Sequence, residues 1–397
     1  MADQFVRMYD YGDAPTIKQF NQDKRFFRCI MGPYGCVPAN TQFLSPHGWK
    51  NISEYSGEKV AQWDRDKNAI SFVTPDEYIK LPCDSFIRFD SGSLVMELSG
   101  EHRVPYYDWN GKFQVKTAAQ IANKPFEGII PTVFAGPKED ALDMSDDLIR
   151  LAVVMHADGH YIKASNKASI CVHKERKKNR IRQLLASLGI EYVEKKAKDR
   201  PTEVSFYFVS PYRGKYFTGK WWSASRRELA IIIDECLHWN GWTQDPDGCA
   251  ETKYFSAYKE NAEFIQYAAH TTGRRAIVGE YVSEYPEKWK QAYYVQIFSW
   301  ESYKNYATIN CDTTKISTVS SVDGNKYCFA VQSGFFVARC EGTIFITGNS
   351  GKSSGCVAEI IDVGISQAPD QNRVRRTRWA VVRSCYDDIT EILTERR

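Results

Sequence analysis

The sequence lacks the features that would place it in several common protein classes. Its eleven cysteines are scattered and form no CxxC pair, which argues against a zinc site and against a disulfide framework. It has no run of about 18 apolar residues, and the opening MADQFVRMYDYGD lacks the basic and apolar regions of a signal peptide. We therefore expect a protein of a reducing cytoplasm, with no membrane partner, whose single cysteines are candidate nucleophiles.

Charge and composition are otherwise ordinary. The net charge is +3, so any contact with nucleic acid must come from local clusters of basic residues. The 397 residues are 43% hydrophobic and 25% charged, which is typical of a soluble globular protein with two or three domains.

A phosphate-binding loop is present in two separated halves. The residues SGKS at 350–353 form its second half, but the preceding ITGN has no glycine at the required spacing. The first half, GPYG, stands at 32–35 after the strand-like FFRCI. Joining Gly35 to Ser350 gives GPYGSGKS, which matches GxxxxGK[ST] at every fixed position. The other interpretation is that SGKSS is a chance Gly/Ser loop.

The joined loop would bind ATP. Gly32, Gly35 and Gly351 would let backbone amides approach the phosphates, Lys352 would reach the β- and γ-phosphates, and Ser353 would hold Mg²⁺. The following SSGCVAEIIDVGIS is helix-like, and its N-terminus favours an anion. These residues can act together only when the intervening segment is gone.

The intervening segment, 36–349, carries at its ends the groups that a self-excision reaction needs. Cys36 can attack the carbonyl of Gly35 through a five-membered ring. Asn349 can attack its own carbonyl to form a succinimide, and the hydroxyl of Ser350 can accept an acyl group. All three steps are nucleophilic acyl transfers.

The blocks at the ends of this segment resemble those of inteins. CVPANTQFLSPHGWKNISEY, from Cys36, is similar to the first block, and YCFAVQSGFFVARCEGTIFITGNS, at 327–350, is similar to the final blocks. SGEH at 99–102 resembles the internal TxxH block, with Ser99 for Thr. The resemblance implies an all-β, horseshoe-shaped splicing domain (Hint domain) formed by about 36–145 and 312–349.

The resemblance also implies a role for each residue, and no cofactor. Cys36 makes an N-to-S shift, and His102, aided by Ser99, protonates or polarises the departing amide nitrogen. Ser350 then accepts the N-terminal segment as a branched ester. Asn349 cyclises and releases the insert, and an O-to-N shift restores a peptide bond.

Two positions depart from the intein pattern. Gly348 precedes Asn349 where most inteins have His, so assistance to cyclisation must come from elsewhere or be weak. Cys328 stands where many inteins have Asp. Cys328 is either a proton donor, a relay nucleophile or a buried structural cysteine. His102 likewise has two interpretations, a catalytic residue or a core histidine whose hydrogen bonds are satisfied.

An internal repeat occupies the middle of the segment, at about 146–311. An apolar helix, LIRLAVVMHADG, and a later one, ELAIIIDECLHWNG, are each followed by a polar β-prone stretch and a further helix. The sequence therefore predicts two αββα units.

These units resemble the LAGLIDADG homing endonucleases, α+β domains that are often nested in inteins. The resemblance implies a pseudo-twofold pair of helices, each delivering one acid to a Mg²⁺ site above double-stranded DNA. Asp158 matches the first acid, whereas Asn240 stands at the second. Because Asn ligates a metal only as a neutral carbonyl, cleavage is expected to be slowed, reduced to nicking or lost. Asp234 and Glu235 lie too far along the helix to be assigned to the metal.

Two alternatives stay open in this inner region. The helix pair could be ordinary core packing. A basic run either binds DNA phosphates or is a solvated helix face; its members are Lys174, Arg176, Lys177, Lys178, Arg180 and Arg182.

The flanks, 1–35 and 350–397, resemble phage terminase large subunits. FFRCIMGPYG joined to SGKSSGCVAEIIDVG, and then RWAVVR, carry the resemblance. It implies a partial α/β ATPase, an N-terminal piece of a larger protein, which binds ATP and packages DNA only after splicing. Its partners would be the terminase small subunit and portal in a phage-infected bacterium. Another P-loop ATPase, such as a helicase, is the competing host.

Overall fold

A computed structural model describes the central part of the chain. The described residues are 35–123, 125–162, 165–200, 202–244, 251–281, 291–299, 306–348 and 371. The chain divides into two units, and the unit Pro33–Ser350 contains all of these residues except Gln371. The two flanks with the loop residues Gly32, Gly351, Lys352 and Ser353, and the junction residues Asn349 and Ser350, lie outside the described residues.

An outer domain is formed by two segments that are far apart in the sequence. The first segment contains β1 (Gln42–Ser45), β2 (Gly48–Asn51), η1 (Ile52–Glu54), β3 (Val60–Asp64), β4 (Ala69–Val73), β5 (Glu77–Pro82), β6 (Ser85–Asp90), β7 (Val95–Leu98), β8 (Arg103–Tyr107), β9 (Phe113–Thr117), α2 (Ala118–Ala122) and β10 (Glu127–Ile130). The second segment contains β19 (Ala307–Asn310), β20 (Lys315–Ser320), β21 (Asn325–Ala330), β22 (Phe335–Cys340) and β23 (Thr343–Gly348).

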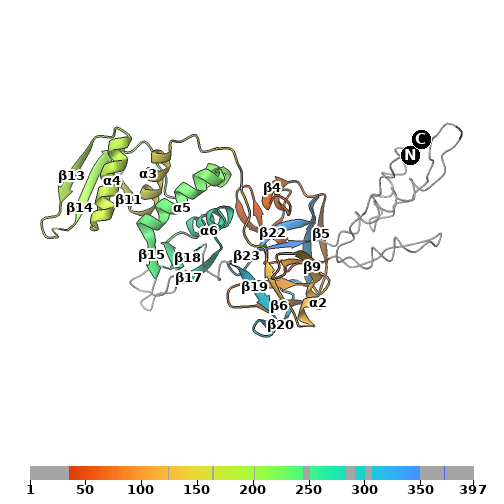
Figure 1. The fold of residues 1–397 in the computed structure, drawn as a ribbon. Coiled ribbons are helices and arrows are strands. Elements are labelled where there is room, and N and C mark those ends of the chain that lie inside the picture. The colour runs from red at the N-terminus through yellow and green to blue at the C-terminus, as the bar shows by residue number, and fades with distance from the viewer. Residues whose placement is uncertain are drawn as a thin grey trace, which may run out of the picture. The chain divides into compact units, whose positions relative to one another are not determined.

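These two segments interleave in antiparallel sheets. The largest sheet has the order β19-β10-β8-β23-β22-β1-β2, while β20 pairs with β6 and β21 with β5. Figure 1 accordingly shows the blue strands β22 and β23 among the orange strands of the first segment. The pairing of β19 with β10 returns the chain to this sheet by Ala307, a few residues before the predicted boundary at 311. Long-range pairing thus brings the two ends of the segment into one sheet.

The inner domain lies between these segments in the sequence and repeats one arrangement. Its first half contains α3 (Asp146–Ala157), β11 (Gly159–Tyr161), β12 (Lys167–Val172), α4 (Glu175–Ser187), β13 (Tyr192–Lys196) and β14 (Val204–Val209). After η2 (Gly219–Ser223), its second half contains α5 (Arg226–Asn240), β15 (Gly241–Gln244), β16 (Glu251–Ser256), α6 (Lys259–Thr271), β17 (Ala276–Tyr281) and β18 (Ala292–Phe298).

The repeat is longer than the sequence predicts. The two sheets have the equivalent orders β11-β12-β14-β13 and β15-β16-β18-β17, so each half is αββαββ rather than αββα. Two strands were missed in each half. One of them, β13, reads YVEKK, whose last four residues are exposed, so it lacks the apolar alternation of a half-buried strand. None of the helices in the described ranges is long and apolar enough to cross a membrane.

The two paired helices, α3 and α5, begin and end alike. Ser145 caps α3 by accepting a hydrogen bond from the Leu148 amide, and Ser225 forms a capping box with Glu228 at α5. A strand that begins at a glycine follows each helix, directly after α5 and one residue after α3. A Cβ on Gly159 would lie 2.7 Å from the Met155 Cα, so only glycine fits this close backbone approach.

One hydrophobic core is shared by the two domains. It contains residues of α3, α5 and α6 together with Trp49, Ile344 and Ile346 of the outer sheet. A second core fills the outer domain and includes Cys36 and Cys328. Because β22 and β23 contribute residues to both cores, each is buried at all six of its positions.

His270 of α6 is a buried histidine that connects the two domains. We expect its protonation to lower the stability of the fold in acid. Its neutral imidazole can donate from Nδ1 to the Thr132 carbonyl (2.6 Å) and accept at Nε2 from the Ala276 amide (3.0 Å). Burial lowers the pKa of His270 to about 4. Because the unfolded chain binds this proton first, the stability from this group is complete above about pH 6.5 and is lost as the pH falls toward 4.

We therefore expect His270→Gln to flatten the loss of unfolding free energy between pH 7 and pH 4. The expected difference from wild type is about 3 kcal/mol. Urea unfolding in an excision-deficient background measures it, with the exposed His160→Gln as the matched control. Equal pH dependence in the two variants would contradict this role.

Candidate functional site

The N-terminal junction is held by a bridge between two distant segments. The Val37 amide donates to the Tyr327 carbonyl and the Tyr327 amide to the Val37 carbonyl, both at 2.8 Å. In this antiparallel register, Cys36 stands opposite Cys328 in the close, non-hydrogen-bonded type of pair. Both cysteines have no exposed surface, so the predicted nucleophile lies in a water-excluded site.

Ser99 contacts the peptide unit on both sides of Cys36. The Cys36 amide donates to Ser99 Oγ (2.9 Å), and the Ser99 amide donates to the Cys36 carbonyl (3.0 Å). The His102 amide in turn donates to the Ser99 carbonyl (2.9 Å). The SGEH turn therefore places a hydroxyl at the nitrogen of the Gly35–Cys36 bond, where the departing amine would form.

His102 packs directly against Gly35. A Cβ on Gly35 would lie 2.4 Å from the His102 Cα, so residue 35 must be glycine here. Burial lowers the pKa of His102 to about 4, although the nearby Gly35 carbonyl favours the protonated form. That carbonyl does not form a full hydrogen bond, because His102 Nδ1 has no hydrogen-bond partner among the described residues. A neutral imidazole thus has a nitrogen available beside the junction.

Thr347 is a member of this site that sequence reasoning missed. Its hydroxyl contacts His102 Nε2, it is buried, and it lies on β23 two residues before Asn349. The contact joins residues 245 positions apart, and threonine in a strand carries no signal for such a role. Thr347 thus brings β23, the strand that ends at Gly348, against the His102 imidazole.

Cys328 is held in its protonated form. A side-chain hydrogen bond with Cys36, and then burial, raise the pKa of the Cys328 thiol well above its ordinary value. A protonated thiol can donate to a thiolate that forms on Cys36. The Cys328 thiol also donates to the Phe329 carbonyl at 3.7 Å. Its role, as proton donor, relay nucleophile or structural cysteine, stays a prediction.

Lys326 and Glu101 form an ion pair at the edge of the site that sequence reasoning also missed. Lys326 Nζ contacts Glu101 Oε1, and Lys326 is buried on the strand that carries Cys328. Glu101 adjoins His102. The pair therefore ties the SGEH turn to β21 and holds the two halves of the site together.

Packing around residue 348 explains why it is a glycine rather than a larger residue. A Cβ at this position would lie 2.5 Å from Phe335 Cδ1 and 2.6 Å from the Gly334 carbonyl oxygen. Phe335 stands opposite Gly348 in the β22–β23 register. The Phe335 ring therefore occupies the space that a side chain preceding Asn349 would need.

We expect Gly348→Ala to destabilise the outer domain by about 1–3 kcal/mol, the usual cost of an overpacked site. Chemical denaturation of the excision-deficient chain measures this loss. In a double-mutant cycle, Gly348→Ala should cost less in a Phe335→Ala background than in the parent, because the smaller side chain removes the overlap with the ring. A Gly348→Ala protein as stable as its parent would show that this steric account is wrong.

In the inner domain, Asp158 ends α3 and bonds to a lysine. It is the C-cap residue, and one carboxylate oxygen lies 2.6 Å from Lys177 Nζ. Lys177 Nζ also lies 5.4 Å from the centre of the Trp239 ring. Asn240 is the last residue of α5, at the equivalent place in the repeat, and its side chain lies outside the described residues.

The described residues do not assemble a divalent-metal site around Asp158. No group of three His, Cys, Asp or Glu side chains gathers in this part of the chain. Glu235 is 3% exposed and bonds Arg180 and the Trp239 indole (2.8 Å) instead. With its one carboxylate paired to Lys177, the site does not fit a hard cation that prefers several oxygen ligands, so we derive no step through a metal.

The basic run on α4 is largely neutralised within the domain. Lys177 pairs with Asp158, Lys178 with Glu175, and Arg182 with Glu194. Arg180 pairs with Glu235. These pairs leave few of its charges available for phosphates.

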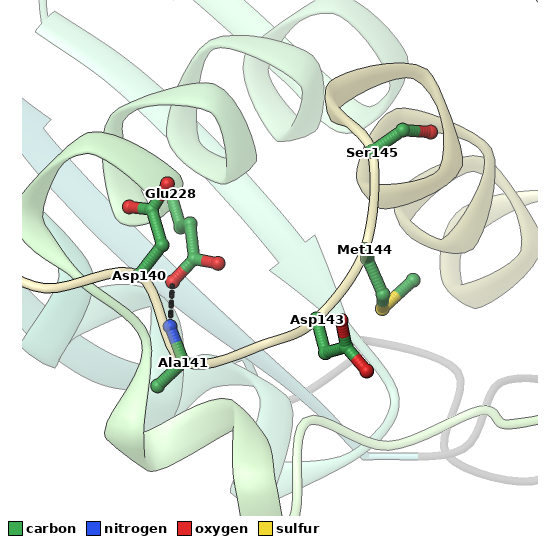
Figure 2. Close-up of a pocket in the computed structure, with 6 residues that line it drawn as sticks. All are labelled: Asp140, Ala141, Asp143, Met144, Ser145 and Glu228. Carbon is green, nitrogen blue, oxygen red and sulfur yellow. Dashed lines mark hydrogen bonds between the residues drawn. The ribbon is translucent and has the colours of Figure 1, made fainter.

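A cavity of about 420 Å³ lies where the chain enters the inner domain (Figure 2). Its acidic lining is used structurally, because the Glu228 carboxylate accepts from the amides of Ala141 and Leu142, both at 3.1 Å. Figure 2 shows Glu228 reaching toward Ala141, with Asp143 and Ser145 on the segment that leads into α3. The cavity thus reflects the anchoring of this segment to the start of α5.

The chain's structural neighbours include an intein and LAGLIDADG proteins. The AceL NrdHF class 3 split intein matches with 11% identity and TM-score 0.31, over 79% of this chain and 98% of that one. The N-terminal LAGLIDADG domain of DUF199/WhiA matches with 11% identity and TM-score 0.29, over 40% and 76%. The homing endonuclease I-DmoI in complex with DNA and Mn matches with 12% identity and TM-score 0.27, over 38% and 89%.

No family model matches the chain, and no curated protein matches it. The structural likenesses have low identity and low TM-scores, so they carry no functional argument. A function for this chain therefore has to be supported by its own residues and their contacts.

Proposed function

We propose that residues 36–349 excise themselves and join Gly35 to Ser350. The observation that carries this proposal is the surrounding of the Gly35–Cys36 bond: its nitrogen donates to Ser99 Oγ at 2.9 Å, and His102 and Cys328 lie beside it. A nucleophile, a proton acceptor and a proton donor thus surround one amide bond in a buried site.

In the first step, Cys36 Sγ attacks the Gly35 carbonyl carbon. The carbon–sulfur bond forms, the carbon–nitrogen bond breaks, and the thiol proton passes to the nitrogen that becomes the amine of Cys36. The His102 imidazole is neutral near pH 7 because its pKa is lowered to about 4, so its Nδ1 can accept that proton, although as a weaker base than an ordinary histidine. Ser99 Oγ, already bonded to the nitrogen, can donate to it once it becomes pyramidal.

The later steps involve residues of the C-terminal junction. The Ser350 hydroxyl takes the acyl group from Cys36 and gives its proton to the thiolate, leaving an ester. The Asn349 side-chain nitrogen then attacks its own carbonyl, which forms a succinimide and frees the Ser350 amine. That amine attacks the ester to form the peptide bond and restores the hydroxyl. The contact between Thr347 and His102 supports the proposal, because Thr347 stands two residues before Asn349 in the sequence.

Expression followed by intact-mass measurement tests the proposal. We expect two products, the excised 36–349 with a C-terminal succinimide or its hydrolysis product, and 1–35 joined to 350–397. An unchanged chain under reducing conditions, over a range of pH and temperature, would oppose self-excision.

For the inner domain we propose binding to double-stranded DNA, with cleavage weak or absent. The repeated αββαββ architecture and the α3–α5 pair support the first part, and the single lysine-bonded Asp158 supports the second. Binding to the uninterrupted host gene, compared with unrelated DNA of equal length, tests the specificity. Equal affinity for both at physiological salt would oppose it.

For the flanks we propose that ligation creates an ATP-binding loop, GPYGSGKS, with Mg²⁺ on Ser353. The continuity of the motif across the junction supports this. A terminase large subunit, with a small subunit and portal as partners, is the host we favour, and a helicase-like ATPase is the alternative. Binding of a labelled ATP analogue by the full-length ligated host, and not by the Lys352→Ala variant, tests the loop itself.

A further inference from the structure

A buried arginine connects the outer sheet to the inner domain. Arg339 on β22 is 3% exposed, and its Nε donates to Gln42 Oε1 of β1 at 2.8 Å. Its Nη2 donates to Glu263 Oε1 of α6 at 2.5 Å. Its guanidinium also lies 4.6 Å from the centre of the Trp49 ring. Separating a buried ion pair leaves an uncompensated charge, which is strongly destabilising. The pair of Arg339 and Glu263 therefore holds α6 and the outer sheet in one arrangement.

The turn between β22 and β23 is held by the same domain. The carbonyl of Gly342 accepts from Gln266 Nε2 of α6 (2.6 Å) and from the Val278 amide of β17 (3.1 Å). Gly342 has φ +75°, and a Cβ there would lie 2.1 Å from the Val278 carbonyl oxygen. The inner domain therefore grips the backbone of this turn at a position that only glycine can occupy.

The turn at Gly342 leads directly to the reaction centre. Strand β23 runs from Thr343 to Gly348, where it pairs with Arg103, the residue after His102. Thr347 on this strand contacts His102. Strand rise places Thr347 only about 16 Å from the turn. The intervening backbone is paired with β22 along its whole length and with β8 at Gly348. A shift at the turn would therefore move the residues that precede Asn349 relative to His102.

We propose that Arg339 and Gln266 are positioning residues for the C-terminal cleavage step, and that α6 of the inner domain is thereby part of the excision machinery. This inference rests on the proposed self-excision. It assigns the inner domain a role in splicing that is separate from DNA binding. Its contacts set the position of β23, and hence of the Asn349 junction, while the bonds around Cys36 and Ser99 come from other strands.

The two cleavage steps can be measured separately in the full chain. In the Asn349→Ala background, hydroxylamine cleavage after Gly35 reports the N-to-S shift. In the Cys36→Ala background, release of the C-terminal flank reports Asn349 cyclisation. Glu263→Gln is introduced into each background, with Glu260→Gln, an exposed carboxylate on the same helix, as the matched control.

We expect Glu263→Gln to slow C-terminal release by about tenfold, because small displacements of reacting groups cost up to about a hundredfold. Hydroxylamine cleavage should stay within about twofold of its parent, and Glu260→Gln should change neither rate. Gln266→Met, which keeps the side-chain volume and removes the bonds to Gly342, Ala276 and Arg339, should show the same split.

Other outcomes overturn the inference in distinguishable ways. Equal slowing of both steps, with a lower melting temperature, would mean that these contacts serve only stability. Unchanged C-terminal release in both Glu263→Gln and Gln266→Met would remove the positioning role while leaving self-excision intact. If the parent backgrounds cleave at neither junction, the proposed function itself fails, and the inference fails with it.

Discussion

Replacing Cys36 by Ala is expected to abolish thioester formation after Gly35 and all production of ligated flanks. Removing a nucleophile removes its whole pathway, so the N-terminal step should slow by at least about 10³-fold. The site offers no water to substitute for the thiol, because Cys36 and Cys328 have no exposed surface. Hydroxylamine trapping followed by mass spectrometry of the N-terminal product measures the loss.

The matched control is Cys311→Ala, which alters a half-buried cysteine elsewhere in the same domain. Its thiol donates to the Ile121 carbonyl and contacts no residue of the junction site in the described structure. This variant should cleave like wild type. Persistent hydroxylamine-sensitive cleavage in Cys36→Ala would mean that another thiol, with Cys328 the nearest, is the first nucleophile.

Replacing Asn240 by Asp is expected to raise cleavage of DNA by the inner domain. Asp158 and residue 240 end the paired helices at equivalent places in the repeat. A second carboxylate would add negative charge for a divalent cation, and the cation bound there would compete with Lys177 for Asp158. We expect at least about a tenfold increase in Mg²⁺-dependent strand cleavage, since each carboxylate supplies a large part of the affinity for a hard cation.

The experiment uses the full chain with Cys36→Ala and Asn349→Ala, and a duplex that contains the uninterrupted junction of the host gene. Asn179→Asp, at an exposed position of α4, is the matched control and should leave cleavage unchanged. If Asn240→Asp binds the duplex but cleaves it no faster than its parent, the second acid is not what limits the site. If it does not bind at all, the DNA-binding proposal is wrong as well.

Much of the site could be predicted from the sequence because its chemistry is carried by short blocks. Cys36, Ser99, His102 and Cys328 were each placed by the block in which they stand, and the structure brings all four together. The internal repeat was likewise visible, since apolar helices ending in glycine recur in the sequence. The contacts among these four residues are long-range, but each residue stands in a block whose own residue order identifies it.

The parts that could not be predicted depend on contacts between distant segments. Thr347 reaches His102, and Phe335 fills the space beside Gly348, only through the register of β23 with its neighbours. The sharing of one core between the two domains, fixed by Arg339 and Glu263, has no counterpart in local sequence. Strand register and domain packing are properties of the whole fold, which single segments do not encode.

The most direct test of self-excision is the chemical structure of the joint. Wild-type protein is expressed, the small product is isolated, and its peptides are sequenced by tandem mass spectrometry across residues 32–35 and 350–353. Self-excision predicts fragment ions that run without interruption through a Gly35–Ser350 peptide bond, reading GPYGSGKS. Fragments that always end in a free Gly35 carboxylate, with Ser350 always at a free amino terminus, would contradict ligation.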